Sequence, residues 1–318
     1  MFNNYPTLTD IAALDAGIGQ PVIDETVAQF DELRTFPADK MTGTSLELSV
    51  LAKLPEASFR NANEGVPRRA AHFETKNFST AFAEQQIGID PAVLNGSKDP
   101  ARTLEEESQP HMISVMSLIA RQIWYGKANN DPKGFVGIGQ QYAADSDHEL
   151  DAGQDTDTAS VWFLQLGPRN VQLVFGNDES LYQRNWREET IYDKDGNPFD
   201  GLTSAIHGRP GLKLQNKHSA MRIRGIGRQK IIGTGLNKYY EGGLNDDLMF
   251  TIFQMFSELN RVRPNAIFMN PRSLEQLRRS RIPVNAIGSP VPLPDNFMGI
   301  PIFNTINLIN GEEKLKAA

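Results

Sequence analysis

The stretch DPARTLEEESQPHMISVMSLIARQIWYG (residues 99–126) sets the frame of the fold, because its pattern is that of one long amphipathic helix. Asp99 is suited to cap the helix and Pro100 to occupy its first position. Apolar residues then recur at helical spacing: Met112, Val115, Met116, Ile119 and Ile123. We predict a helix that Gly126 ends and that Pro110 kinks or restarts, since proline removes a backbone donor.

Before this helix, two strand patterns flank a polar stretch. LELSVLAKL (46–54) alternates imperfectly as a strand, and HFETKNFSTAFAEQQIGI (72–89) follows the polar RNANEGVPRR (60–69). An isolated two-stranded hairpin is marginal in water, and a tip with so few apolar residues cannot offset its ordering entropy. The pattern predicts a long hairpin-like projection that needs a neighbouring molecule to lie on, preceded by an extended arm with at most one short helix (1–45).

After the helix, a loop-like acidic region (127–157) leads into strand patterns and then into alternating helix and strand. Strands are expected at 160–166, 170–176, 211–215, 219–227 and 230–236. A helix then begins at Asn245 or Asp246 and closes at Pro264. A short strand (266–270), a helix opened by Pro271 and one or two closing strands (298–309) complete the pattern.

Composition bounds the classes of protein that this chain can be. Its 318 residues, 39% hydrophobic and 22% charged, suffice for one large core or two moderate ones. No apolar run is long enough for a bilayer span and no signal peptide is evident, so we expect a protein made and used in a cytoplasm. Zero cysteines exclude disulfides, thiolate metal sites and a cysteine nucleophile. The net charge of −7 disfavours non-specific binding to nucleic acid or anionic membrane.

No motif for catalysis, cofactor binding or metal binding stands out. The glycine pairs at 137–139, 225–227 and 233–235 lack the third glycine of a dinucleotide fingerprint, and strand bulges or turns explain them better. The five histidines are scattered, and the acidic stretch 145–157 lacks the pattern of a calcium loop, which favours a solvated loop. We expect no enzyme activity, no cofactor and no metal.

One basic concentration lies near the carboxyl end. Its arginines could face packaged nucleic acid or a neighbour's carboxylates, while solvated helix faces and ion pairs between subunits are the favoured alternative. The candidate residues are Arg261, Arg263, Arg278, Arg279 and Arg281.

The segment WYGKANNDPKGFVGIGQQY (124–142) resembles the end of the spine helix in major capsid proteins of tailed bacteriophages with the Hong Kong 97-type fold, in a podophage-like group. There a tyrosine-glycine step leads into a phenylalanine-glycine segment. Further similar patterns follow in the same order: RNANEGV, TASVWFLQLG, VQLVFG, GLKLQNKHSAMRIRGIG, AIFMNPRSLEQLRRS and FMGIPIFNT. Together they span about residues 60–310, and their shared order is harder to obtain by chance than any one of them.

The resemblance implies an α+β fold with an amino-terminal arm (1–45), an extended loop (46–88), a peripheral domain (89–236) and an axial domain (237–318). The peripheral domain would hold the spine helix (99–125) and long strands. Because those strands (158–232) precede the αβ segment (237–310), we expect a permuted order of elements.

The function that follows is structural. The chain would assemble with itself into hexamers and pentamers of an icosahedral head that encloses double-stranded DNA without sequence-specific binding. A separate scaffolding protein, a cement protein and the portal are expected partners, with no membrane, and the location is the virion capsid, assembled in the host bacterial cytoplasm. The loop tip would make the contacts between subunits, through Phe59, Arg60, Asn61, Asn63, Glu64, Val66, Arg68 and Arg69.

Three further expectations remain open at this point. No lysine-to-asparagine cross-link is expected, since Lys53, Lys76 and the tip asparagines match no known motif. The nearest rival is an encapsulin-like nanocompartment shell, which shares the fold and holds protein cargo. The rival from another class is a cytoplasmic αβ enzyme, which predicts a small oligomer with a ligand pocket.

Overall fold

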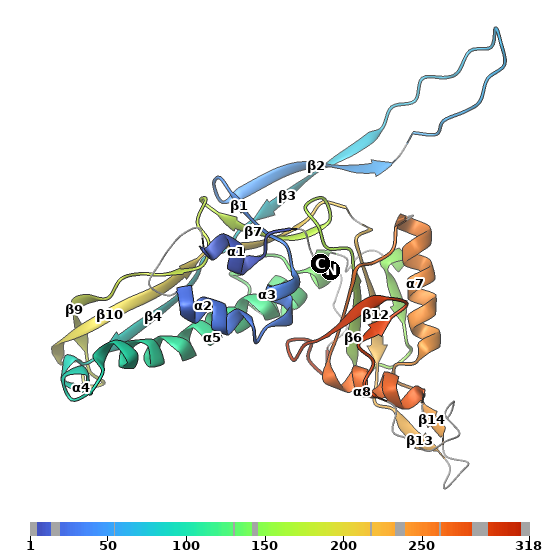
Figure 1. The fold of residues 1–318 in the computed structure, drawn as a ribbon. Helices are drawn as coiled ribbons and strands as arrows, with labels where there is room; N and C mark the ends of the chain where they lie inside the picture. The colour runs from blue at the N-terminus through green and yellow to red at the C-terminus, as the bar shows by residue number, and fades with distance from the viewer. Residues whose placement is uncertain are drawn as a thin grey trace.

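The computed structural model describes residues 5–13, 20–53, 55–129, 131–141, 146–216, 218–232, 239–260, 262–281 and 292–312. Figure 1 shows an elongated α+β molecule: a long helix and a twisted sheet at one end, a sheet covered by helices at the other, and a hairpin that projects away from both. No helix among the described residues has the length and apolarity that crossing a membrane requires.

The amino-terminal segment forms three short helices, so the prediction of an extended arm with at most one helix was wrong. They are α1 (Leu8–Ala13), α2 (Gln20–Val27) and α3 (Asp31–Thr35). Their apolar residues, among them Leu8, Ile23 and Leu33, are buried in the same core as the long helix. Helices this short are unstable alone, so packing against the body supplies the stability that local sequence lacks.

The predicted hairpin is present in residues 45–79, but its predicted second strand (72–89) is divided, since residues 83–89 pair with residues 202–208 in another sheet. Strand β2 (Ser45–Lys53) pairs antiparallel with β3 (His72–Ser79), from Ser45 opposite Ser79 to Lys53 opposite His72. Residues 55–71 continue beyond the ladder as an exposed tip (Figure 1). We call residues 45–79 the extended hairpin and residues 55–71 the hairpin tip.

The long helix is α5 (Pro100–Asn129), preceded by α4 (Pro91–Asn95). The helix continues through Pro110 without a restart; Pro110 is exposed, so water can satisfy the carbonyl that it frees. As predicted, the backbone leaves helical geometry at Gly126, whose φ is 61° and ψ is −152°. Residues 131–141, which include α6 (Ile138–Gln141), fold back against the helix end.

The six-stranded sheet has the order β16-β17-β15-β6-β12-β5. Its strands are β5 (Glu149–Asp151, after a 3-10 turn at Ser146–His148), β6 (Ala159–Leu164), β12 (Ala220–Ile226), β15 (Ala266–Met269), β16 (Asn296–Phe297) and β17 (Ile300–Asn304). Alternate side chains of β6 enter different cores: Val161 and Phe163 join the core of α7 (Asp246–Asn260) and α8 (Pro271–Ser280), while Trp162 joins the core of α5. The sheet therefore separates two cores and holds both ends of the body together.

The remaining strands form three described sheets besides the extended hairpin. One has the order β1 (Ala38–Met41), β7 (Val171–Gly176), β11 (Pro210–Leu214). Another joins β4 (Ala83–Ile89), β10 (Pro198–Gly208) and β8 (Tyr182–Gln183), with β9 (Arg187–Tyr192) also on β10. The third pairs β13 (Lys230–Ile232) with β14 (Tyr239–Glu241).

This distribution removes the basis for a permuted order of elements. That expectation placed all strands of residues 158–232 in one domain, whereas the structure divides them among four sheets. Strands β6 and β12 lie in one sheet with β15 and β17, so hydrogen bonding crosses the predicted boundary at residue 236. Continuously buried strands carry no sign of which sheet they join, which is why the sequence pattern misled here.

Gly126→Ala is expected to lower the free energy of unfolding by at least about 2 kcal/mol. The alanine would have to adopt the positive φ of Gly126, and its Cβ would also overlap the backbone of Gly137. A Cβ at Gly126 would lie 2.3 Å from the backbone nitrogen of Gly137. The control is Gly153→Ala, which has a similar φ of +83° but open space around it. Urea unfolding compares them; equal losses from both variants would show that the close approach of the two glycines is unimportant.

Candidate functional site

The hairpin tip exposes two apolar side chains that have no place in either core. Phe59 is 108% exposed and Val66 is 44% exposed. The Arg69 guanidinium forms an ion pair with the Glu56 carboxylate across the tip. Phe59 and Val66 lie before and after the turn that closes the tip, and we call these two exposed apolar side chains the knob.

A short turn closes the tip. The backbone nitrogen of Asn61 donates to a Glu64 carboxylate oxygen at 3.1 Å, and the nitrogen of Glu64 donates back to the Asn61 carbonyl at 3.3 Å. The Arg60 guanidinium donates to the Glu64 carbonyl at 3.1 Å, and Asn63 adopts a φ of 68° that asparagine tolerates. Arg68 lies exposed on the returning side. The predicted tip residues thus lie together, on an element that no other part of the chain covers.

The carboxyl-terminal arginines are engaged within the chain. Arg278 and Arg279 donate to the Glu275 carboxylate at 2.6 and 2.9 Å, and Arg281 pairs with Asp246 at 2.6 Å. The Arg263 guanidinium lies 6.0 Å from the centroid of the Phe253 ring. Arg261 lies outside the described residues. These ion pairs form because acidic partners lie one helical turn away or on α7. That the arginines face nucleic acid or a neighbouring subunit stays a prediction.

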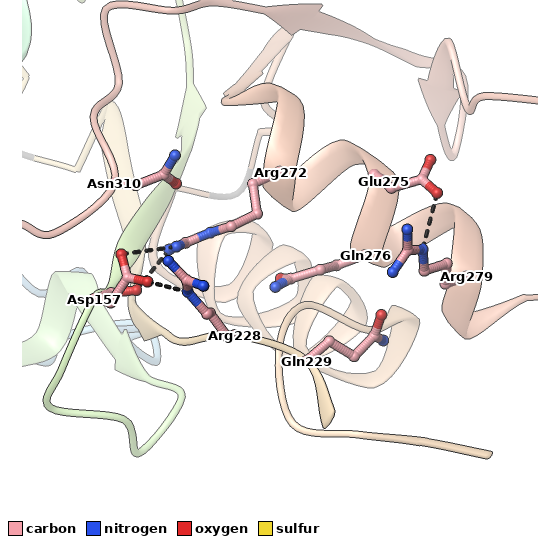
Figure 2. Close-up of a pocket in the computed structure, with 8 residues that line it drawn as sticks. All are labelled: Asp157, Arg228, Gln229, Arg272, Glu275, Gln276, Arg279 and Asn310. Atoms are coloured by element: carbon pink, nitrogen blue, oxygen red, sulfur yellow. Dashed lines mark hydrogen bonds and ion pairs between the residues drawn. The ribbon is translucent and has the colours of Figure 1, made fainter. Parts of the chain in front are cut away.

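A polar pocket of about 320 Å³ lies beside α8, where that helix meets the turns before β6 and after β12 (Figure 2). Asp157 lies between two arginines: Arg272 donates to it at 3.0 Å and Arg228 forms a second ion pair. The hydrogen bond from Arg228, followed by that from Arg272, holds the pKa of the Asp157 carboxyl below its ordinary value. Asp157 belongs to the acidic stretch that we predicted to be a solvated loop; its side chain is 36% exposed, so the two ion pairs form at the edge of the solvent.

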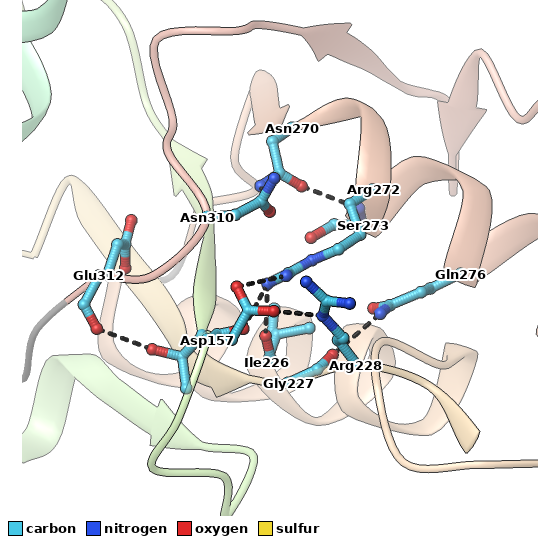
Figure 3. A network of polar contacts seen from close by, with 11 residues as sticks. Asp157, Ile226, Gly227, Arg228, Asn270, Arg272, Ser273, Gln276, Asn310 and Glu312 are labelled. Carbon is cyan, nitrogen blue, oxygen red and sulfur yellow. Dashed lines mark hydrogen bonds and ion pairs between the residues drawn. The ribbon is translucent and has the colours of Figure 1, made fainter.

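The contacts around this pocket tie several chain segments together (Figure 3). Arg272 also donates to the carbonyls of Asp157 and Ile226 at 2.7 and 3.3 Å, and Gln276 donates to the carbonyl of Gly227 at 2.9 Å. Asn270 caps α8 through Ser273 and donates to Asn310 at 2.8 Å. The network is a structural clamp on the six-stranded sheet, with every charge beside an opposite one.

Tyr125, in the predicted tyrosine-glycine step, fastens the end of the described chain. Its hydroxyl donates to a Glu312 carboxylate oxygen at 2.8 Å and accepts from the backbone nitrogen of Ile309 at 2.7 Å. Ser160 donates to the other carboxylate oxygen, and Thr158 pairs with the Glu312 backbone. Burial of the Glu312 carboxyl raises its pKa above 4.5, against the opposing effect of these hydrogen bonds.

Glu312→Gln is expected to gain stability relative to the parent as pH rises above 4.5. Between that ordinary value and the raised pKa of Glu312, the folded chain keeps a proton that the unfolded chain releases, so the parent loses stability with rising pH. Glutamine can keep the acceptor oxygen and does not titrate.

Urea unfolding at a series of pH values measures the difference between the two chains. Glu189→Gln is the control of opposite sign, because the Thr203 hydroxyl, ahead of Arg187, lowers the pKa of Glu189 and stabilises its ionised form. A difference in unfolding free energy between the parent and Glu312→Gln that does not change with pH would contradict the raised pKa of the buried Glu312 carboxyl.

Among the described residues, no group of three or more His, Asp or Glu side chains could hold a metal ion. Sequence reasoning missed one pairing: His148 Nε2 lies 2.7 Å from His218 Nδ1, with the rings stacked. They are 70 residues apart, so no local spacing could have revealed them.

Comparison with known proteins identifies the family. A family model described as major capsid protein GP7 matches residues 22–315, which is most of the chain. The chain belongs to the GP7 family of major capsid proteins. A search of curated protein sequences finds no match.

Two solved capsid structures have folds similar to that of this chain. A chain of bacteriophage Epsilon15 is similar with a TM-score of 0.57 and 17% identity, and the match covers 88% of each chain. A chain of the bacteriophage JBD30 capsid has a TM-score of 0.51 and 10% identity, over 85% of this chain and 89% of that one. The predicted Hong Kong 97-type α+β fold is confirmed, as is the role of a structural subunit of an icosahedral phage capsid.

Proposed function

We propose that this GP7-family chain closes its shell by laying the extended hairpin on a neighbouring copy, within hexamers and pentamers. The observation that carries the proposal is the hairpin tip: every residue from 55 to 70 is exposed, and neither side chain of the knob, Phe59 or Val66, belongs to either core. An exposed aromatic at the end of a projection is the kind of anchor that dominates interface energies.

The proposed arm is residues 1–45 and the proposed extended loop is residues 46–88. The six-stranded sheet joins strands from both sides of residue 236, so it does not follow the predicted division into a peripheral domain (89–236, with its spine helix) and an axial domain (237–318). Without cysteines, shell strength has to come from contact area, and no lysine-to-asparagine cross-link is required. The chain acts as a structural component and not as an enzyme.

The proposed partners are a separate scaffolding protein, a cement protein and the portal, and assembly takes place in the host bacterial cytoplasm before the chain resides in the virion. Packaged DNA is enclosed by the shell but is not bound tightly by this chain. The net charge of −7 and the internal pairing of Arg278, Arg279 and Arg281 support this, since these three arginines already have carboxylate partners.

Sedimentation and negative-stain imaging of the expressed chain, with and without the products of neighbouring genes, test the proposal. Megadalton icosahedral particles are the expected result. A discrete dimer that turns over a substrate would overturn it in favour of the enzyme, and shells filled with a protein cargo would favour the nanocompartment.

A further inference from the structure

The polar pocket beside α8 has an arginine on each of two walls. Figure 2 shows Arg228, in the turn after β12, and Arg279, on α8, on opposite sides of the pocket. The side-chain amides of Gln229 and Gln276 lie between them. The side chains of Arg228 and Arg279 are 80% and 42% exposed, so dissolved ligands reach both. The pocket is therefore open to a ligand, although each arginine has an ion-pair partner in the chain.

Each of these two arginines uses only part of its guanidinium within the chain. Arg228 donates to the Asp157 carboxylate through Nε, and Arg279 donates to the Glu275 carboxylate through Nε at 2.9 Å. Among the described residues, the terminal amino groups of both arginines have no hydrogen-bond acceptor. A guanidinium has five N–H donors and binds a carboxylate or a phosphate through two of them at once. The free edges of Arg228 and Arg279 therefore suit the oxygens of an anion.

The rest of the lining also has polar atoms without a partner among the described residues. Arg272 Nε is a buried donor with no acceptor, and Asn310, which accepts from Asn270 through Oδ1, has an unused amide nitrogen. Gln229 Oε1 is a buried acceptor with no donor. Buried polar atoms without partners are unfavourable, so the lining favours a ligand that both accepts and donates hydrogen bonds. Hydrogen phosphate does both, because it carries several acceptor oxygens and a hydroxyl group.

Charge and size limit the ligand to a small one. The lining holds three arginines and two carboxylates, Asp157 and Glu275, so it carries one net positive charge. Its volume of about 320 Å³ is at the lower end of the range for small-molecule sites. The net charge of −7 on the whole chain disfavours a long polyanion such as DNA.

We propose that this pocket binds a phosphate group, as inorganic phosphate or as part of a small phosphorylated compound, through the free guanidinium edges of Arg228 and Arg279. The ligand ties the turn after β12 to α8 by a bridge that the chain's own carboxylates do not make, since Asp157 joins Arg228 to Arg272 and Glu275 pairs with Arg279. A ligand that binds the folded chain alone also raises its stability by mass action. The shell subunit thus has a small-molecule site in addition to its contacts with other copies.

Isothermal titration calorimetry of the full chain with inorganic phosphate and with glycerol phosphate tests the proposal, at an ionic strength held constant with sodium chloride. Saturable binding of one phosphate per chain is expected. Arg228→Gln combined with Arg279→Gln is expected to weaken it at least about tenfold, because both free edges are lost. The matched control, Arg34→Gln combined with Arg187→Gln, removes the same charge from exposed ion pairs outside the pocket and should keep the parent's affinity. Circular dichroism checks that both variants fold.

The tighter of the two ligands identifies the source of the phosphate group. No saturable binding of either ligand, or equal losses of affinity in the pocket variant and the control, would overturn the proposal. Binding of duplex DNA without binding of either small phosphate would overturn it in favour of a nucleic-acid contact. If the pocket variant does not fold, Arg228→Lys supplies the measurement, since it keeps the charge at an exposed position and removes the planar fork. Weaker phosphate binding is expected from this variant, and the parent's affinity would count against the site.

Discussion

Replacing residues 57–68 with Asn-Gly is expected to abolish closed shells and to leave a folded, soluble subunit. The edit suits the ladder, because Glu56 lies opposite Arg69 and Asn-Gly forms the two-residue turn that antiparallel strands prefer. All the removed residues are exposed, so neither core loses a contact. Each subunit loses the exposed side chains of its knob, Phe59 and Val66. Because the same contact is weakened at every subunit, the free-energy losses add up over the whole shell.

Gradient sedimentation measures the fraction of subunits in particles, and circular dichroism with thermal unfolding measures whether the subunit folds. The matched control replaces residues 57–68 with a Gly/Ser segment of the same length, which keeps the reach of the hairpin and removes its side chains. Loss of shells in both variants assigns the effect to the tip side chains. Normal shells from the shortened chain would contradict the proposed role of the hairpin.

Local signals in the sequence were sufficient for the helices with clear boundaries. α5, α7 and α8 begin and end close to the predicted residues, because caps, prolines and apolar spacing act within one or two turns. The prediction for the arm was wrong because local signals are weak there: its three helices are too short to be stable without the core that buries them. The pairing of β6 with β12 and β15 depends on contacts across long stretches of chain, which strand patterns do not encode.

The features of the candidate site also differ in whether the sequence could predict them. The hairpin tip could be found from sequence because it has few apolar residues and lies between two strand patterns. The clamp of Asp157 by Arg228 and Arg272 could not, since its partners are 71 and 115 residues away. A run of arginines shows positive charge but not which carboxylates neutralise it, and Glu275 and Asp246 do so here.

Glu149→Ala is expected to cost about 3–5 kcal/mol of unfolding free energy, the usual penalty for removing one partner of a buried ion pair. Arg222, on β12, is 4% exposed and pairs with the Glu149 carboxylate on the neighbouring strand β5. Its guanidinium lies 5.3 Å from the centroid of the Trp162 ring, so it cannot turn to water when the carboxylate is lost. Arg224, at 3.4 Å from Glu149, loses a partner as well but keeps Asp151 at 3.1 Å.

The matched control is Glu189→Ala, which breaks an exposed pair with Arg187 and is expected to leave the free energy of unfolding nearly unchanged. Urea unfolding of the soluble subunit measures both variants. Glu149→Gln combined with Arg222→Met should recover most of the loss, because the cost comes from the charge left unpaired beside Trp162 and not from the missing attraction alone. A loss of the same size in the double variant would show instead that the fit of β5 against β12 carries the stability. The two results therefore decide whether the sheet between the two cores depends on this charge pair or on packing.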